Sequence, residues 1–228
     1  MQSPSDSSSD PRVQVFRAEW DDEGVFLYQA FKHEIADWAV EHQTLGGECF
    51  NPDRMTWIKP SFAWVLYRSG YATKFNQERI LKIKIGHDDL ADLLSKCACG
   101  DGHGGCLGRV QWDPERDIMM PGKKGKEPRK MCRRRAIQIG LSQKLSRRYV
   151  ESIISIEDVT ELAHRVRDAH SVLAKHSKSD VMEPLCRYLP EERPYMPRMS
   201  KRVLSNLALI PGKQADEHYQ IGRGKVKR

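Results

Sequence analysis

The sequence predicts an α+β fold in which helices flank a single mixed, mainly antiparallel sheet. Short apolar runs of strand length alternate along the chain with amphipathic stretches of helical period, and no internal repeat is visible. The chain has 228 residues, of which 39% are hydrophobic, so it is long enough to bury a sizeable core. We therefore expect one domain over residues 13–210, a disordered segment over residues 1–12 and a basic tail over residues 211–228.

The first part of the chain is predicted to alternate between strands and helices. Residues 25–31 are rich in aromatic and aliphatic side chains and predict a strand, whereas residues 34–43 repeat apolar side chains at helical spacing. Residues 81–85 alternate apolar side chains with lysines, which predicts a strand with one face in solvent. Asp88 or Asp89 can then cap a helix that runs to about Lys96.

Between these units, residues 54–70 set two Arg, a Lys, a Thr and two Ser among three Trp and Tyr rings. Pro60 suits the first position of a helix, and Gly70 can end that helix. Hydroxyl and cationic groups at the start of a helix lie where backbone N–H groups also point outward, a geometry that holds anions. The alternative is a packed helix in which Arg68 is paired internally.

In the second half of the chain, residues 109–112 and 135–141 predict two strands. The second strand alternates large apolar residues with Ala136, Gln138 and Gly140, so that its other face is small and polar. Such a face is suited to the floor of a cleft. Ser142 can start the helix that follows.

The C-terminal third is expected to be mainly helical. Ser155, with Asp158 three residues further on, resembles a capping box for a helix that continues to about Leu173. Residues 180–197 contain four prolines and predict a strap over the surface. Ser200 can cap a last short helix.

The positive charge of the chain is concentrated in one segment. Residues 123–135 contain eight basic residues and a single Glu, an excess that equals the net charge of +7 of the whole chain. We expect a basic loop over residues 121–135, which can supply affinity for RNA or DNA together with the basic tail. A solvated surface insertion is the alternative. The candidate nucleic-acid contacts are Lys123, Lys124, Lys126, Arg129 and Lys130.

A loop over residues 97–106 carries three thiols and an imidazole with the spacing C-x-C-x3-H-x2-C, contributed by Cys97, Cys99, His103 and Cys106. A single residue between the first two ligands makes tetrahedral zinc difficult to close, so the interpretation stays open between a metal site, reactive or disulfide-forming thiols and an inert loop. No metal site is assigned.

Cysteine usage and hydropathy restrict where the protein is expected to work. The six Cys follow no small secreted disulfide framework, and no apolar run approaches the roughly eighteen residues of a membrane span. Residues 1–11 are rich in Ser, Asp and Pro and do not resemble a signal peptide. We therefore expect an intracellular protein, cytoplasmic or nuclear, that does not bind membranes.

Several long motifs resemble the family catalogued as domain of unknown function 4291. The similarity covers roughly residues 15–160 and, more weakly, residues 192–195 with the helix beyond them. The motifs are Tyr28-Gln29-Ala30-Phe31, the segment 54–70, Val110-Gln111-Trp112-Asp113-Pro114-Glu115-Arg116, Arg135-Ala136-Ile137-Gln138-Ile139-Gly140-Leu141 and Ile156-Glu157-Asp158-Val159-Thr160. The family name carries no established chemistry.

Patterns for common enzyme classes are missing from the sequence: there is no P-loop, no G-x-G-x-x-G, no H-E-x-x-H and no serine nucleophile elbow. The polar residues of the family motifs instead suggest a pocket for a nucleotide-type small molecule, in which cations bind phosphates and aromatic rings stack. The candidate ligand-binding residues are Arg17, Tyr28, Gln29, Arg54, Thr56, Lys59, Ser61, Arg68, Trp112 and Arg116, and the candidate catalytic residues are Glu115 and Gln138.

A more distant resemblance connects the order of elements to the compact α/β domain of ADP-ribosyltransferases. This resemblance implies NAD as the cofactor, with Arg17 or Arg54 on the pyrophosphate, Tyr28 stacked on nicotinamide and Thr56 on ribose. It further implies that Glu115 stabilises the cationic ribosyl group or orients the nucleophile. The sequence departs from better-known members because it lacks a clear His at the end of the first strand and a Glu-x-Glu or Gln-x-Glu pair on the last.

Two other functions remain open from the sequence. The first is a nonenzymatic RNA- or DNA-binding module, in which the basic loop tracks phosphates while Trp57, Trp64 or Trp112 stacks on bases. The second is a partner-binding scaffold in which the motif residues are structural. For Glu115, the alternative to catalysis is a turn in which it pairs with Arg116 or Arg109.

Overall fold

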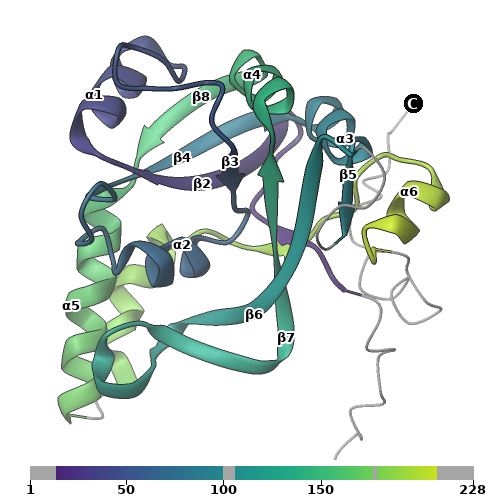
Figure 1. Cartoon of the computed structure of the whole chain (residues 1–228). Helices are drawn as coiled ribbons and strands as arrows, with labels where there is room; N and C mark the ends of the chain where they lie inside the picture. Colours follow the sequence, from purple (N-terminus) through teal and green to yellow (C-terminus); the bar gives the residue numbers. More distant parts are fainter. Residues whose placement is uncertain (1–13, 100–105, 177–178, 210–228) are drawn as a thin grey trace, which may run out of the picture.

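The computed structural model describes residues 14–99, 106–176 and 179–209, which form an α+β fold (Figure 1). The predicted disordered segment 1–12 and the predicted basic tail 211–228 lie outside the described residues. The strands form three sheets and not the single sheet that the sequence predicted. None of the described helices is both long and apolar enough to cross a membrane.

The first sheet is antiparallel and contains β2 (Gly24–Phe31), β4 (Arg79–Gly86) and β8 (Ile153–Asp158), in the order β2-β4-β8. Strands β2 and β4 confirm two sequence predictions. Each strand continues into a helix, α1 (His33–His42) after β2 and α3 (His87–Ser95) after β4.

The second sheet has the order β3-β7-β6-β5, from β3 (Thr56–Ile58), β7 (Pro128–Leu141), β6 (Gly108–Pro121) and β5 (Cys97–Cys99). Only the β5–β6 pair is parallel among these strands.

The two larger sheets meet at one residue pair, Tyr28 and Lys59, where the Tyr28 N–H donates to the Lys59 carbonyl at 2.7 Å. The pairing stops there because Pro60 has no N–H to continue the ladder and the chain turns into α2 (Phe62–Ser69). The prediction of a single sheet is wrong for this reason: a long ladder is replaced by one bridge.

The remaining elements surround these sheets. A small antiparallel sheet joins β1 (Arg17–Ala18) to β9 (Arg193–Pro194), which is part of the predicted proline-rich strap. The helices are α4 (Gln143–Glu151), α5 (Thr160–His176), the 3₁₀ helix η2 (Ser179–Tyr188) and α6 (Lys201–Asn206).

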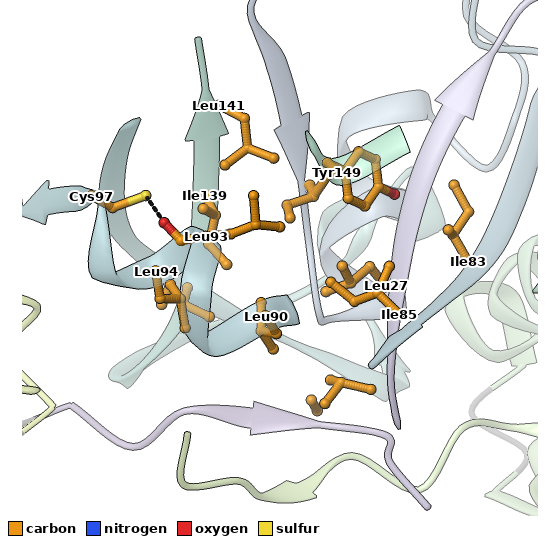
Figure 2. Close-up of a cluster of buried hydrophobic side chains, with 14 of the residues drawn as sticks. Leu27, Ile83, Ile85, Leu90, Leu93, Leu94, Cys97, Ile139, Leu141 and Tyr149 are labelled. Atoms are coloured by element: carbon orange, nitrogen blue, oxygen red, sulfur yellow. Dashed lines mark hydrogen bonds between the residues drawn. The ribbon is translucent and has the colours of Figure 1, made fainter. Parts of the chain in front are cut away.

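The main core lies where α3 and α4 pack against both larger sheets (Figure 2). Leu27, Ile83 and Ile85 come from the first sheet, Ile139 and Leu141 from the second, and Leu90, Leu93, Leu94 and Tyr149 from the helices. Burial of each such side chain contributes about 1.5–3 kcal/mol. This shared core holds the two sheets at a fixed angle to each other even though a single bridge joins their strands.

Helix boundaries confirm some predicted signals and correct others. Gly70 ends α2 in the left-handed conformation, and the Ser200 side chain accepts a hydrogen bond from the Val203 N–H at the start of α6. Pro60 precedes the helix cap and is not the first helical residue. The predicted capping box at Ser155 is wrong, because Ser155 lies inside β8 and pairs with Lys84.

The predicted basic loop is largely the outer half of a long hairpin. Strands β6 and β7 extend far beyond residues 109–112 and 135–141, and only the short 3₁₀ turn η1 (Lys123–Gly125) lies at the tip. We call residues 116–135 the arm. The arm packs along α5 (Figure 1).

The arm is separated from the inner hairpin by an irregular bulge. Pro114 pairs with Arg135, but the next pair joins Arg116 to Lys130, so β7 has extra residues at 131–134. The ladder is disrupted and the strands bend at such a bulge, so strict alternation of side chains does not continue across it. Gln111 and Asp113 on the inner half of β6 and Arg116 on the outer half all line one pocket, described below.

Candidate functional site

A pocket of about 1070 Å³ lies between the bridge of the two sheets, α2 and the hairpin. It brings together residues from distant parts of the sequence, and eight of the predicted site residues line it: Gln29, Arg54, Thr56, Lys59, Arg68, Arg116, Lys130 and Gln138. We call this space the cationic pocket, because six basic residues and one acidic residue line it: Lys32, Arg54, Lys59, Arg68, Arg116 and Lys130 against Asp113.

Aromatic rings lie among these cations. Lys59 Nζ is 5.3 Å from the centre of the Trp64 ring, and the Arg68 guanidinium is 5.6 Å from the same ring. Tyr67 contacts Trp64 edge-on at 6.1 Å, and the Arg116 guanidinium lies 3.5 Å above the Tyr67 ring. Helix α2 thus supplies two rings and Arg68, while Lys59 before the helix and Arg116 from β6 approach the same rings, an arrangement that suits an anion with a flat aromatic part.

Lys59 is a cation of the pocket whose pKa is shifted by its surroundings. Burial lowers the pKa of Lys59 to about 8, and repulsion by Arg68 adds to this effect, while Asp113 opposes it. Its ammonium donates to the Trp57 carbonyl at 3.3 Å and makes no ion pair with the described part of the chain. A bound anion would therefore stabilise the charged form of this lysine.

Arg116 contributes a buried donor without a partner. Its side chain is only 7% exposed, and it contacts Glu127 at 3.4 Å and the Pro128 carbonyl at 3.4 Å through one terminal nitrogen. Its Nε is buried and has no hydrogen-bond partner among the described residues. A buried donor of this kind is normally satisfied, which points to an external acceptor at the pocket wall.

Gln138 forms the centre of a small polar network on the sheet side of the pocket. Its amide nitrogen donates to Asp113 Oδ2 at 2.6 Å and to Gln111 Oε1 at 2.9 Å. Burial raises the pKa of Asp113, although Arg68, Gln138 and Lys59 favour its charged form. The predicted polar face of β7 thus does line a cleft, and it positions the one carboxylate among the described lining residues.

Two predicted ligand-binding residues make structural contacts as well. Gln29 is buried, donates to the Trp57 carbonyl at 3.1 Å and accepts from the Tyr149 hydroxyl at 2.9 Å. The Thr56 hydroxyl lies 3.0 Å from the Ser146 hydroxyl. These bonds fix the pocket wall where β2 and β3 meet.

Other predicted residues lie on the opposite sides of their strands. Tyr28 is 1% exposed, packs against Phe62 and donates to Glu19 at 2.7 Å, next to a second cavity of about 230 Å³. Trp112 donates to the Leu207 carbonyl at 3.0 Å. Neither residue lines the cationic pocket, because adjacent side chains of a strand point to opposite faces.

Glu115 is also separated from the cationic pocket. It lies on β6 opposite the bulge of β7 and pairs with Arg134 at 2.9 Å and with Arg17 at 3.7 Å. Burial raises the pKa of Glu115, and these two arginines oppose that effect. The pairs differ from the Arg116 or Arg109 partners that the sequence suggested, and they place Arg17 beside Glu115 and away from the pocket.

The start of α2 is occupied by groups of the protein itself. Ser61 caps the helix by accepting from the Trp64 N–H at 3.4 Å, and the Phe62 N–H donates to Glu192 at 2.7 Å. Burial raises the pKa of Glu192 to about 7. Since Glu192 already takes the position expected for an external anion, the anion-binding groups of this region are the side chains of Lys59 and Arg68 and not the backbone of the helix start.

The Cys-rich segment is only partly described, since His103 lies outside the described residues. Cys97 is buried and donates to the Leu93 carbonyl at 3.3 Å (Figure 2), and burial raises its pKa to about 12. Within residues 14–99, 106–176 and 179–209, no group of three or more His, Cys, Asp or Glu is arranged to hold a metal ion.

Sequence reasoning missed several pocket residues. Tyr67 was part of the aromatic stretch but received no role, although its position three residues after Trp64 would have placed both rings on one helical face. Lys32, Phe50, Asn76 and Gln77 line the pocket from loops and element ends, and no local pattern marks them.

Comparison with known families gives a match over most of the chain. Residues 15–195 match the family model described as "Domain of unknown function (DUF4291)". The chain belongs to this family. The DUF4291 match confirms the resemblance found in the sequence motifs, and it contains every residue that lines the cationic pocket. None of the curated proteins matches the chain.

Proposed function

We propose that the cationic pocket of this DUF4291 protein binds a nucleotide-type ligand through its phosphates and its base. The observation that carries the proposal is the six-to-one excess of basic residues around a pocket that also contains Trp57, Trp64 and Tyr67. Cations near flat rings match the phosphates and the base of a nucleotide. The volume of about 1070 Å³ slightly exceeds the usual range for small-molecule sites, which leaves room for a dinucleotide.

NAD is our candidate ligand, and transfer of its ADP-ribosyl group is the candidate reaction. Cleavage of the bond between nicotinamide and ribose develops positive charge on the ribose, which a nearby carboxylate stabilises. Asp113 is the one carboxylate among the described residues of the pocket, and Gln138 holds it in place. We therefore assign the stabilising role to Asp113, with Gln138 as its positioning residue, and not to Glu115.

Isothermal calorimetry with NAD, ADP-ribose and ATP tests the binding proposal. Arg68→Ala should weaken binding about tenfold to a hundredfold, because a charge-assisted hydrogen bond contributes on the order of 1.5–3 kcal/mol. Arg54→Ala tests the second exposed arginine of the pocket in the same way. The matched control is Arg202→Ala, which removes an exposed arginine outside the pocket and should leave affinity unchanged.

The absence of heat from all three nucleotides with the folded protein would reject nucleotide binding. Equal affinities for Arg68→Ala, Arg54→Ala and the control would reject this pocket as the site. The reaction is tested separately by nicotinamide release: Asp113→Asn should abolish it, and Glu115→Gln should retain it. The reverse pattern would return the catalytic role to Glu115.

A further inference from the structure

The arm carries a run of basic side chains that the protein does not neutralise. Three of its cations are paired: Arg116 with Glu127, Arg129 with Asp117 and Arg134 with Glu115. Five further cations are exposed and have no acidic partner among the described residues: Lys123, Lys124, Lys126, Lys130 and Arg133. A cluster of one sign on a single hairpin attracts a polyanion, because each neutralised phosphate releases condensed counterions.

This run of charge is continuous with the cationic pocket. Arg116 and Lys130 face each other across the hairpin, and both line the pocket. From Lys130 the chain leads directly to the remaining lysines at the tip of the arm. A chain of phosphates that follows β7 would therefore pass from the tip of the arm to the pocket along Lys126, Arg129 and Lys130, with Glu127, which pairs with Arg116, as the one acidic residue on this path.

An exposed aromatic ring lies close to the other side of the pocket. Phe75 is 85% exposed, and its neighbours in sequence, Asn76 and Gln77, line the pocket. The turn that carries it is tightly constrained, with Asn76 in the left-handed conformation at φ 61°. A phenylalanine gains nothing from this exposure in the isolated protein, whereas an exposed ring beside a cationic groove is a stacking platform for a nucleobase.

We propose that the arm and Phe75 bind a single-stranded nucleic acid whose terminal nucleotide occupies the cationic pocket. This inference rests on the nucleotide-binding function proposed above and names a polymer as the molecule that the pocket recognises. The arm contacts the phosphates, Phe75 stacks on a base near the end, and Trp64 and Tyr67 flank the terminal nucleotide. A duplex fits this arrangement poorly because its bases are paired and cannot separate onto Phe75 and into the pocket.

Fluorescence anisotropy with a short labelled strand tests the polymer contact at several salt concentrations. The test variant replaces Lys123, Lys124 and Lys126 with Ser, and the control replaces the exposed Lys144, Lys175 and Lys201 with Ser, so that both lose the same charge. The test variant should lose affinity on the order of tenfold. The slope of log affinity against log salt concentration should become shallower by about 2, because each phosphate contact to a single strand adds about 0.7 to that slope. The control should match the wild type.

The aromatic contact is tested by two substitutions of the same residue. Phe75→Ala should weaken binding of the strand on the order of tenfold, whereas Phe75→Trp should retain it, because stacking requires only a flat ring. Equal affinities for the Ala and Trp variants would exclude stacking. RNA and DNA strands, each with a phosphate at the 5′ or the 3′ end, identify the preferred polymer and end.

Competition separates this inference from the pocket proposal. ATP should displace the strand, Arg68→Ala should weaken both ATP and the strand, and the triple Lys variant should weaken the strand alone. If ATP binds but the triple variant and its control bind the strand equally, the polymer inference fails and the pocket proposal stands. Binding of the strand without competition by ATP, or preference for a duplex, also overturns the inference. If ATP, NAD and ADP-ribose all fail to bind, both the pocket proposal and the polymer inference fail.

Discussion

The Tyr71 hydroxyl lies 2.8 Å from His170 Nδ1, and His170 Nε2 lies 2.9 Å from the Ile118 carbonyl. A carbonyl can only accept, so Nε2 carries the hydrogen of a neutral ring and Nδ1 accepts from the tyrosine. His170 is buried on α5, Tyr71 follows α2, and Ile118 belongs to the arm. One neutral histidine thus joins the base of the arm to the two helices beside it.

We predict that acidification loosens this junction. Burial lowers the pKa of His170, while the Ile118 carbonyl and Asp117 oppose this effect. The pKa of His170 is therefore lower in the folded state than in the unfolded state, where it is about 6.5. The neutral ring contributes its full stability above about pH 6.5, and this contribution is lost as the pH falls through the folded-state pKa.

Urea unfolding near pH 5 and about pH 7.5 measures this loss. The difference in the free energy of unfolding between the wild type and His170→Gln should be smaller at the lower pH. A difference that stays constant would contradict the role of the neutral ring. Tyr71→Phe should cost about 1–3 kcal/mol at the higher pH, because a buried ring nitrogen loses its donor.

The stability contribution of Glu192 should depend on pH with a sign opposite to that of His170. Its pKa is raised to about 7 by burial, so the folded state binds the proton more tightly than the unfolded state does. The stability contribution is therefore complete below the unfolded-state pKa of about 4.5 and is lost as the pH rises through about 7.

Glu192→Gln should remove this loss, because glutamine stays neutral and still offers an oxygen to the Phe62 N–H. Above pH 7 the variant should exceed the wild type by on the order of 1–3 kcal/mol, since one pKa unit corresponds to about 1.4 kcal/mol. The control is Glu191→Gln, whose exposed side chain predicts no change. Parallel stability curves for wild type and Glu192→Gln would disprove the assignment.

Lys59 should make ligand binding depend on pH. Its pKa of about 8 means that the ammonium becomes neutral as the pH rises through that value, so affinity for ADP-ribose should decline there. Calorimetry in buffers of different ionisation enthalpy should detect proton uptake on binding.

Lys59→Arg should remove the pH dependence because arginine stays charged. Lys59→Met should lower affinity about tenfold or more near pH 7. Uptake that persists in the Arg variant would assign the proton to another group.

A substitution at Gly140, which does not line the pocket, should change ligand binding by moving Trp57. A Cβ at this position would lie 2.9–3.0 Å from the Trp57 ring, which must then move. Trp57 lines the pocket, so Gly140→Ala should weaken nucleotide binding several-fold while the melting temperature falls only slightly. Unchanged affinity would show that the ring position does not matter for the ligand. Trp57→Phe provides the comparison, since it shortens the same ring without a clash.

The local part of the fold was accessible from the sequence, since β2, β4 and the C-terminal end of α2 follow from alternation and from residues such as Gly70. The polar face of β7 with Gln138 was also identified correctly as the floor of a cleft. These features depend on neighbours in sequence, and their physical causes act over a few residues.

The remaining features depend on contacts between distant segments. The choice between Asp113 and Glu115 follows from a bulge in the pairing of β6 with β7, and strict alternation would have placed both carboxylates on one face. The occupation of the α2 start by Glu192 joins residues 130 positions apart. Neither relationship leaves a local signal, so the predicted site combined cations that line the pocket with a carboxylate, Glu115, that does not.

The bulge at residues 131–134 has a consequence for how the molecule can vary. These residues are mostly exposed, they lack partners in the β6–β7 ladder, and the inner pairs from Gly108 to Pro114 do not depend on them. A change in their number would re-aim the outer hairpin while the pocket floor kept its geometry. The bulge is therefore a joint at which a change of length alone would move Arg116 and Lys130 relative to the pocket floor, and with them the direction of the arm.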